Sequence, residues 1–143
     1  MNPHHPPLAP KSTPPLTHET VALLRRIQHQ LDKNPEGFHM EWWHRDPGDH
    51  QPGRQARFRF PCNTTHCIAG WAQELTGQDL MGKGYHDMVG VSHYQGSILF
   101  HADHWPDEFE AAYRRAEKSL DHHEMAAVAI QRIQHFIDTN GEQ

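Results

Sequence analysis

The sequence predicts a mainly α-helical fold: a single compact domain of four to five helices with a small extended or hairpin element near residues 38–60. Three observations lead to this prediction. Apolar residues recur at helical spacing in two long segments, cap residues mark the ends of several others, and strand-like alternation is confined to one stretch. With 143 residues, the chain has the length of one domain that can bury a core of its own.

The chain divides into a tail and one domain. Residues 1–16 hold six of the eleven prolines, which remove backbone donors and favour extended backbone. We expect this Pro/His-rich tail to be flexible and to precede a single helical domain over residues 17–141. Extended proline-rich segments can dock on other proteins, so the tail is one candidate interaction element.

The first helix is predicted to begin after Thr17, whose hydroxyl suits an N-cap, and to end at Asn34, the residue before a proline. Between these residues, aliphatic side chains recur at helical spacing and form one apolar stripe. The stripe consists of Val21, Leu24, Ile27 and Leu31. We interpret it as the face that this helix turns to the core.

Two shorter helices are predicted from their end signals. One begins near Asn63, which serves as its N-cap, and stops at Gly77, a residue suited to a left-handed exit. The other opens with the capping box of Ser92 and Gln95, spaced as S-x-x-Q. Both segments carry apolar side chains that would join the core.

The last part of the chain predicts two further helices. Asp103 is positioned to cap the first, which has Pro106 in its first turn. Asp121 and Glu124 form a capping box that opens the second, and Asn140 and Gly141 supply its left-handed end. The apolar face of this last helix contains Ala126, Ala129, Ile130, Ile133 and Ile137. We expect it to pack on the stripe of the first helix.

Residues 37–61 differ from the rest because apolar and polar side chains alternate there with the period of a strand. Phe38 and Met40 begin one run, Phe58 and Phe60 lie in the other, and a turn-rich loop at residues 46–53 separates them. We therefore expect a small hairpin, or two extended segments, covering the helical core.

The second extended run is also the one basic and aromatic patch in the sequence. Such patches can bind phosphates or single-stranded bases, but more often form the solvated face of an amphipathic strand. The net charge is −5, and sequence-independent phosphate binding depends on Lys and Arg, so nucleic-acid binding is not expected. The candidate binding patch consists of Arg54, Arg57, Phe58, Arg59 and Phe60.

Composition excludes a membrane-spanning protein, since no apolar run approaches the roughly 20 residues that a span requires. The first residues show no apolar segment of the secretory type, which predicts a cytoplasmic protein. Fifteen histidines make the chain histidine-rich. Most of them are expected on a solvated surface, but His66, His101 and His104 are expected to be partly buried. We expect a loss of stability below about pH 6.5, mainly from His66 and His104, because burial disfavours the charged imidazolium and a helix N-terminus acts on His66 in the same direction.

The segment from Cys62 to Ala72 is the most distinctive in the sequence. With Asn63 as the N-cap, Cys62 takes position N′ and Cys67 position N4, which touch in a hydrophobic staple. The two sulfurs should therefore be neighbours, and the simplest interpretation is a packing staple of small buried side chains. Trp71 is expected to anchor this helix in the core.

Three other interpretations of this segment remain open. Cysteine and histidine side chains could bind zinc tetrahedrally, although the spacing is not C-x-x-C. A cysteine at a helix N-terminus could act as a nucleophile beside a histidine, and a disulfide could join the two cysteines. The candidate zinc ligands are Cys62, His66 and Cys67, with His101 or His104 as the fourth.

The pattern C-x-T-x-x-C-x-A-G-W-A over residues 62–72, followed by G-x-S at residues 90–92, resembles a group of small uncharacterised bacterial and phage proteins. Those proteins usually have glycine where this chain has Asn63, and the loop at residues 44–53 looks like an insertion. The resemblance implies a compact helical domain and transfers no catalytic residue.

Taken together, these features favour a small soluble intracellular binding or regulatory module without catalytic activity. Its ligand is unknown, and another protein is the candidate partner. The sequence shows no phosphate-binding loop, paired-carboxylate signature or nucleophile elbow. The alternatives are a structural or hydrolytic zinc protein, and a phage or host interaction factor that uses the Pro-rich tail.

Overall fold

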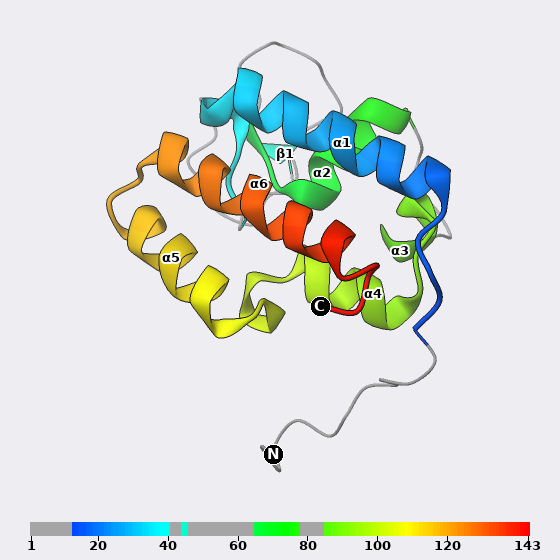
Figure 1. The fold of residues 1–143 in the computed structure, drawn as a ribbon. Helices are drawn as coiled ribbons and strands as arrows, with labels where there is room; N and C mark the ends of the chain where they lie inside the picture. The colour runs from blue at the N-terminus through cyan, green and yellow to red at the C-terminus, as the bar shows by residue number, and fades with distance from the viewer. Residues whose placement is uncertain (1–12, 41–43, 46–64, 78–84) are drawn as a thin grey trace.

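The structure is a computed structural model that describes residues 13–40, 44–45, 65–77 and 85–143. Six α-helices dominate it: α1 (His18–Lys33), α2 (Ile68–Thr76), α3 (Tyr85–Val89), α4 (His93–Phe100), α5 (Asp107–Lys118) and α6 (His122–Asp138). Two 3₁₀ turns, η1 (Pro35–Gly37) and η2 (Ala102–His104), follow α1 and α4. Strands β1 (His44–Arg45) and β2 (Thr65–His66) are short. The predicted mainly helical fold is confirmed (Figure 1).

Helix α6 lies at the centre of the fold. In Figure 1 it runs between α1 and α5 and antiparallel to both, and it contacts each of them along its length. Its buried face is wider than the predicted isoleucine stripe, because Met125, Phe136 and Arg132 are buried beside Ile133. Ile130 is only partly buried. A helix covered by neighbours on two sides needs more than one apolar stripe.

Helix α1 has the predicted ends. Thr17 caps it by accepting a hydrogen bond from the backbone N of Thr20, and the helix stops before Asn34. Leu24, Ile27 and Leu31 are completely buried, as the stripe predicts, whereas Val21 is only partly buried and Leu23 is buried instead. The buried face of α1 packs on α6.

The capping box predicted for α4 is confirmed, and for α6 the N-cap residue of the predicted box is confirmed. Ser92 and Gln95 form the complete capping box of α4, and Asp121 accepts a hydrogen bond from the backbone N of Glu124. The predicted cap of α5 is wrong, because Asp103 lies in η2 and Pro106 is the N-cap. The proline is thus placed one residue outside the helix, where its missing N–H is not needed.

The predicted start of α2 is wrong as well. The helix begins after Cys67, which is its N-cap, and not after Asn63. Residues 65 and 66 belong instead to β2, which pairs antiparallel with β1 in the register His44 with His66 and Arg45 with Thr65. Backbone pairing with β1 therefore holds this segment out of the helix. The predicted end of α2 is right, since Gly77 adopts a left-handed conformation with φ of 68°.

This strand pair is the extended element of the fold. Strand β1 lies within the predicted region of residues 38–60, whereas its partner β2 lies beyond that region, just before α2. The second predicted run, residues 56–60, lies outside the described residues.

The end of the predicted tail contacts the domain. Gln95 Nε2 donates a hydrogen bond to Pro14 O over 2.7 Å, and the backbone N of Leu16 donates to Asn140 Oδ1 over 3.0 Å. Leu16 also packs against the core. Contacts with the domain thus begin before Thr17, while residues 1–12 lie outside the described part of the chain. None of the described helices is both long enough and apolar enough to span a bilayer.

Candidate functional site

Cys67 is buried, and its sulfur caps the N-terminus of α2. Its Sγ accepts a hydrogen bond from the backbone N of Gly70 over 3.3 Å, which is an N-cap contact. The predicted staple with Cys62 assumed that Cys67 occupies N4, one turn further into the helix, and this assumption is wrong. Cys62 itself lies outside the described residues. Trp71 is the predicted core anchor: it is buried and donates from Nε1 to Gly37 O over 3.0 Å.

The structure places the histidines proposed as zinc ligands in other surroundings than the sequence predicted. His101 and His104 are exposed, not partly buried, and their ring centroids lie 5.6 Å apart. His104 Nδ1 is within 2.9 Å of Ser97 Oγ. His66 lies on β2 rather than in a helical turn, so the expected effect of the helix N-terminus on it no longer applies.

The described residues contain no group of three or more His, Cys, Asp or Glu side chains able to hold a metal ion. Cys67, His101 and His104 therefore do not make such a group with one another. The side chains of Cys62 and His66 are not described, so the zinc interpretation stays a prediction for them. The patch of residues 54–60 also lies outside the described chain.

The one completely buried cation among the described residues is Arg132, on α6. Its Nη2 donates to Ile98 O over 2.9 Å, its Nη1 donates to Gln143 O, and the guanidinium lies 5.9 Å from the ring centroids of Phe109 and Phe136. Ile98 lies in the last turn of α4, where carbonyls have no partner within the helix. Burial lowers the pKa of Arg132 to about 10, so it stays cationic at neutral pH. Arg132 thus ties α6 to the ends of α4 and of the chain.

Two other titratable groups are unusual in their surroundings. Burial raises the pKa of Glu74, on α2, from 4.5 to about 7. His39 is buried beside α5 and α6, with its Nε2 3.7 Å from Glu117 Oε2 and its ring centroid 6.2 Å from that of His122. His122 Nδ1 in turn lies 2.9 Å from Phe38 O. These contacts fix residues 38–40 on the two helices.

A groove of about 390 Å³ lies between α5 and α6. Three small apolar side chains line it, and polar or charged side chains line the rest. The apolar members are Ala112, Ala116 and Val128, and the others are Arg115, Ser119, Asp121 and Glu124. Arg115 comes from the last turn of α5, whereas Glu124 comes from the first turn of α6. The groove therefore has a small apolar part and charges of both signs around it.

Leu120 lies in the turn beside this groove, between the lining residues Ser119 and Asp121. Its side chain is 58% exposed, and it is the one large hydrophobic residue so exposed within the described segments. Its φ of 51° is left-handed, a conformation that costs an L-residue other than glycine about 1 kcal/mol. An exposed leucine alone is common on protein surfaces. An exposed leucine in a left-handed position is not.

The backbone of this turn shows why the position is left-handed. The N of Leu120 donates to Glu117 O over 2.9 Å and the N of Asp121 donates to Ala116 O over 3.0 Å, the two hydrogen bonds of a Schellman motif. Leu120 occupies the C′ position, which is usually glycine or asparagine. Glycine or asparagine would adopt this backbone conformation at a lower cost, so the turn does not explain why position 120 holds a leucine.

No family model, curated protein or solved structure matches the chain. The candidate site therefore depends on geometry alone: the groove, the charges around it and Leu120. The sequence pattern pointed to Asp121 and Glu124 only as a capping box, and it gave no sign of the groove or of Leu120. Leu120 sits between two helical patterns and carried no signal, because only the backbone angles reveal that a leucine is costly there.

Proposed function

We propose that the chain is a small protein-binding module, and that it binds its partner through the end of the α5–α6 hairpin. We define this surface, the hairpin end, as the groove residues together with Leu120. The partner that fits it presents a helical turn with one exposed aliphatic side chain between charges of both signs. A cytoplasmic location, a regulatory role and the resemblance to small bacterial and phage proteins remain parts of this proposal.

The observation that carries the proposal is the exposed Leu120 in a left-handed conformation. Residues that keep an unfavourable backbone conformation cluster at functional positions. Apolar side chains near the centre of an interface supply much of its binding energy, and polar side chains form its rim. The hairpin end combines these two kinds of side chain: three small apolar residues and three charged residues line the groove, and the exposed Leu120 stands between the lining residues Ser119 and Asp121 in the sequence.

The shape of the groove supports the proposal too. Alanines at positions 112 and 116 of α5 leave space above the contact with α6, where larger side chains would fill it. Such space between two helices can receive a side chain of another protein, as in other complexes of helices with grooves. Charges of opposite sign on the two sides would orient the incoming segment and reject partners of one strong sign.

A peptide selection tests this proposal without knowledge of the natural partner. The probe is a displayed library of helical peptides with one central leucine and varied charges around it, selected on the full chain. We expect an enriched peptide whose binding perturbs the backbone amide signals of residues 112–128. Failure of any peptide to enrich over a leucine-free library, or perturbation of other regions only, would overturn the proposal.

Two matched variants locate the binding. Ala112 lines the groove, and Ala111 is its exposed neighbour, outside the groove. Ala112→Phe should fill the groove and weaken binding of the selected peptide at least tenfold, whereas Ala111→Phe should leave it unchanged. Equal affinity of both variants for the peptide would place the binding elsewhere and contradict the proposal.

A further inference from the structure

We infer that the partner of the hairpin end is a second copy of this chain, joined to the first by a two-fold axis at that surface. The inference rests on the proposed function and names its partner. In a two-fold dimer the same surface is used twice, so each contact between two residues occurs in both directions. The surface must therefore be complementary to itself, in charge and in shape.

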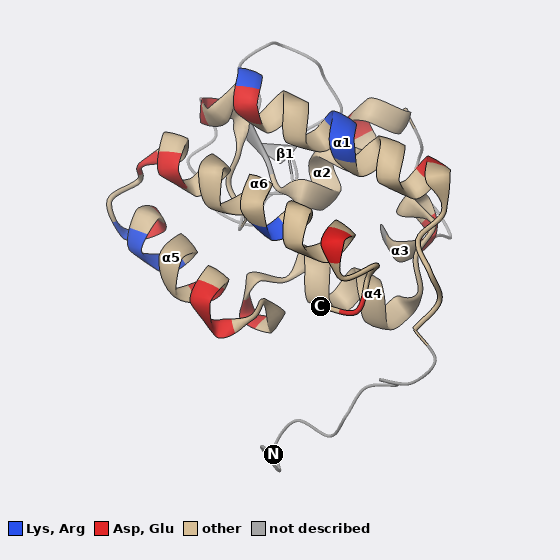
Figure 2. Cartoon of the chain, viewed as in Figure 1, with Lys and Arg blue, Asp and Glu red and all other residues tan. Residues whose placement is uncertain are grey.

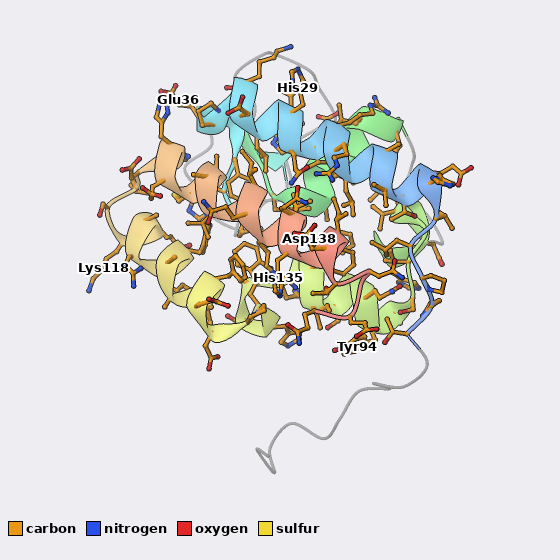
Figure 3. All side chains as sticks on the ribbon, in the orientation of Figure 1. His29, Glu36, Tyr94, Lys118, His135 and Asp138 are labelled. Carbon is orange, nitrogen blue, oxygen red and sulfur yellow. The ribbon has the colours of Figure 1, made fainter. Side chains whose placement is uncertain are left out.

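The charges of the hairpin end meet this requirement. Arg115 comes from the last turn of α5, Asp121 is the N-cap of α6 and Glu124 comes from its first turn, and all three line the groove. Figure 2 shows basic residues at the end of α5 and acidic residues at the start of α6. Arg115, Glu124 and Lys118 are exposed, and Lys118 points away from the molecule (Figure 3). When two hairpin ends face each other across a two-fold axis, α5 of one copy lies over α6 of the other. Arg115 then faces Glu124 of the second copy.

The apolar side chains of the hairpin end are also complementary to one another in shape. The surface carries both a protruding aliphatic side chain, Leu120, and a groove of about 390 Å³ with Ala112, Ala116 and Val128 in its wall. In the dimer, Leu120 of each copy enters the groove of the other. The exposed leucine and the groove are thereby used together, and each removes the other's apolar surface from water.

The charges around the groove also argue against a partner segment that is strongly basic or strongly acidic. A strongly basic segment in the groove would meet Arg115, and a strongly acidic one would meet Asp121 and Glu124. Either one would lose on one side of the groove what it gains on the other. A second copy avoids this conflict because it brings both signs in the required order.

Sedimentation equilibrium of the full chain tests the inference. The surface is small, so we expect a weak dimer, whose average mass rises from 16.6 kDa toward twice that value between about 1 and 500 µM protein. Leu120→Asn should weaken the dimer at least tenfold. A wild-type mass of one chain over the whole range would overturn the inference.

Charge reversal shows whether the dimer uses the proposed pairs. Arg115→Glu alone should face Glu124 of its second copy with a like charge, and Glu124→Arg alone should face Arg115 with a like charge. Each variant should remain monomeric by itself. An equimolar mixture of the two should dimerise again, because both contacts then join opposite charges. A mixture that stays monomeric although the wild type dimerises would overturn the two-fold arrangement.

A control reversal is available at the far end of the fold. Glu19 is an exposed carboxylate in the first turn of α1, as Glu124 is in α6. Glu19→Arg should dimerise like the wild type, and circular dichroism should show all variants to be helical. Loss of dimer in Glu19→Arg would place the interface elsewhere. A monomeric wild type whose groove still binds the selected peptide would sink the second copy alone and leave the proposed function standing.

Discussion

Helices α5 and α6 are each followed by a left-handed residue at the C′ position, but the side chains at these two positions differ. After α6, Asn140 is left-handed with φ of 55°, and the N of Gly141 donates to Phe136 O over 2.8 Å. Asn140 is a suitable residue for that conformation, and its Oδ1 accepts the hydrogen bond from Leu16. After α5, the equivalent position holds Leu120, whose side chain is exposed. The side chain of Asn140 therefore stabilises the end of α6, whereas the turn after α5 gives no reason for a leucine at position 120.

The wider surroundings of the two ends differ in the same way. The end of α6 is covered by the residues before α1 and by Gln95, so closely that a Cβ added to Gly141 would lie 2.4 Å from Gln95 Nε2. The hairpin end has an open groove instead. The comparison shows a closely packed end and an open end on the same central helix, and the proposed binding surface is the open one. The variants below test this division, from the largest expected effect to the smallest.

Ile133→Ala should give the largest loss of stability. Ile133 is completely buried in the contact of α6 with its neighbours, so its truncation should lower the free energy of unfolding by about 2–5 kcal/mol. Urea denaturation measures this loss. The matched variant Ile130→Ala, at a partly buried position, should lose less than half as much. A loss below 1 kcal/mol in Ile133→Ala would contradict the assignment of this face to the core.

Arg132→Ala should be nearly as costly. It leaves the carbonyls of Ile98 and Gln143 without their donor and removes packing beside two phenylalanine rings, which together should cost about 2–4 kcal/mol. Arg132→Met keeps part of the packing and buries no charge, so its loss should be smaller. Chemical denaturation of both variants decides this. Equal losses would show that packing contributes nothing and the hydrogen bonds everything.

These two neighbours on α6 also show how far the sequence could predict the fold. Ile133 was assigned to the core from its helical spacing, as were Leu24 and Leu31, and the structure bears these assignments out. Arg132 was not singled out, because a pattern of apolar positions treats any arginine as a surface residue. Its burial depends on where α4 and the chain end lie, which is information about tertiary contacts.

The start of α2 was missed for a related reason. Asn63 is by its side chain a better N-cap than Cys67, so local propensity favours the earlier start. The pairing of β2 with β1 holds residues 65–66 in an extended conformation, and the partner strand is about twenty residues away in the sequence. Every inference that counted positions from Asn63, including the cysteine staple, was affected by this one contact.

Asn140→Leu makes the end of α6 resemble that of α5. It places a leucine in a left-handed position and removes the hydrogen bond to Leu16, so it should lower stability by about 1–2 kcal/mol. Thermal and urea denaturation measure this. A variant as stable as the wild type would show that left-handed leucine is harmless in this fold, and would weaken the argument from Leu120.

The stability of the chain should also depend on pH through Glu74. The pKa of Glu74 is raised in the folded state, so the protonated carboxyl favours folding. This favourable contribution to the free energy of unfolding is fully present below about pH 4.5 and is lost as pH rises through about 7. Glu74→Gln should therefore gain on the wild type between pH 5 and 8, by about 1 kcal/mol, since the carboxyl is partly solvated. A constant difference over this range in denaturation experiments would contradict the raised pKa. Comparisons of other variants are best made at one pH above this range.

The most direct test of the division between folding and binding is the free energy of unfolding of Leu120→Asn, measured by urea denaturation at about 1 µM chain, where the proposed dimer is dissociated. Asparagine suits the left-handed C′ position and leucine does not, so the variant should be more stable than the wild type by about 1 kcal/mol. That result would show that Leu120 is retained for something other than the fold. A loss of 1 kcal/mol or more would instead make Leu120 part of the folded core and contradict the account.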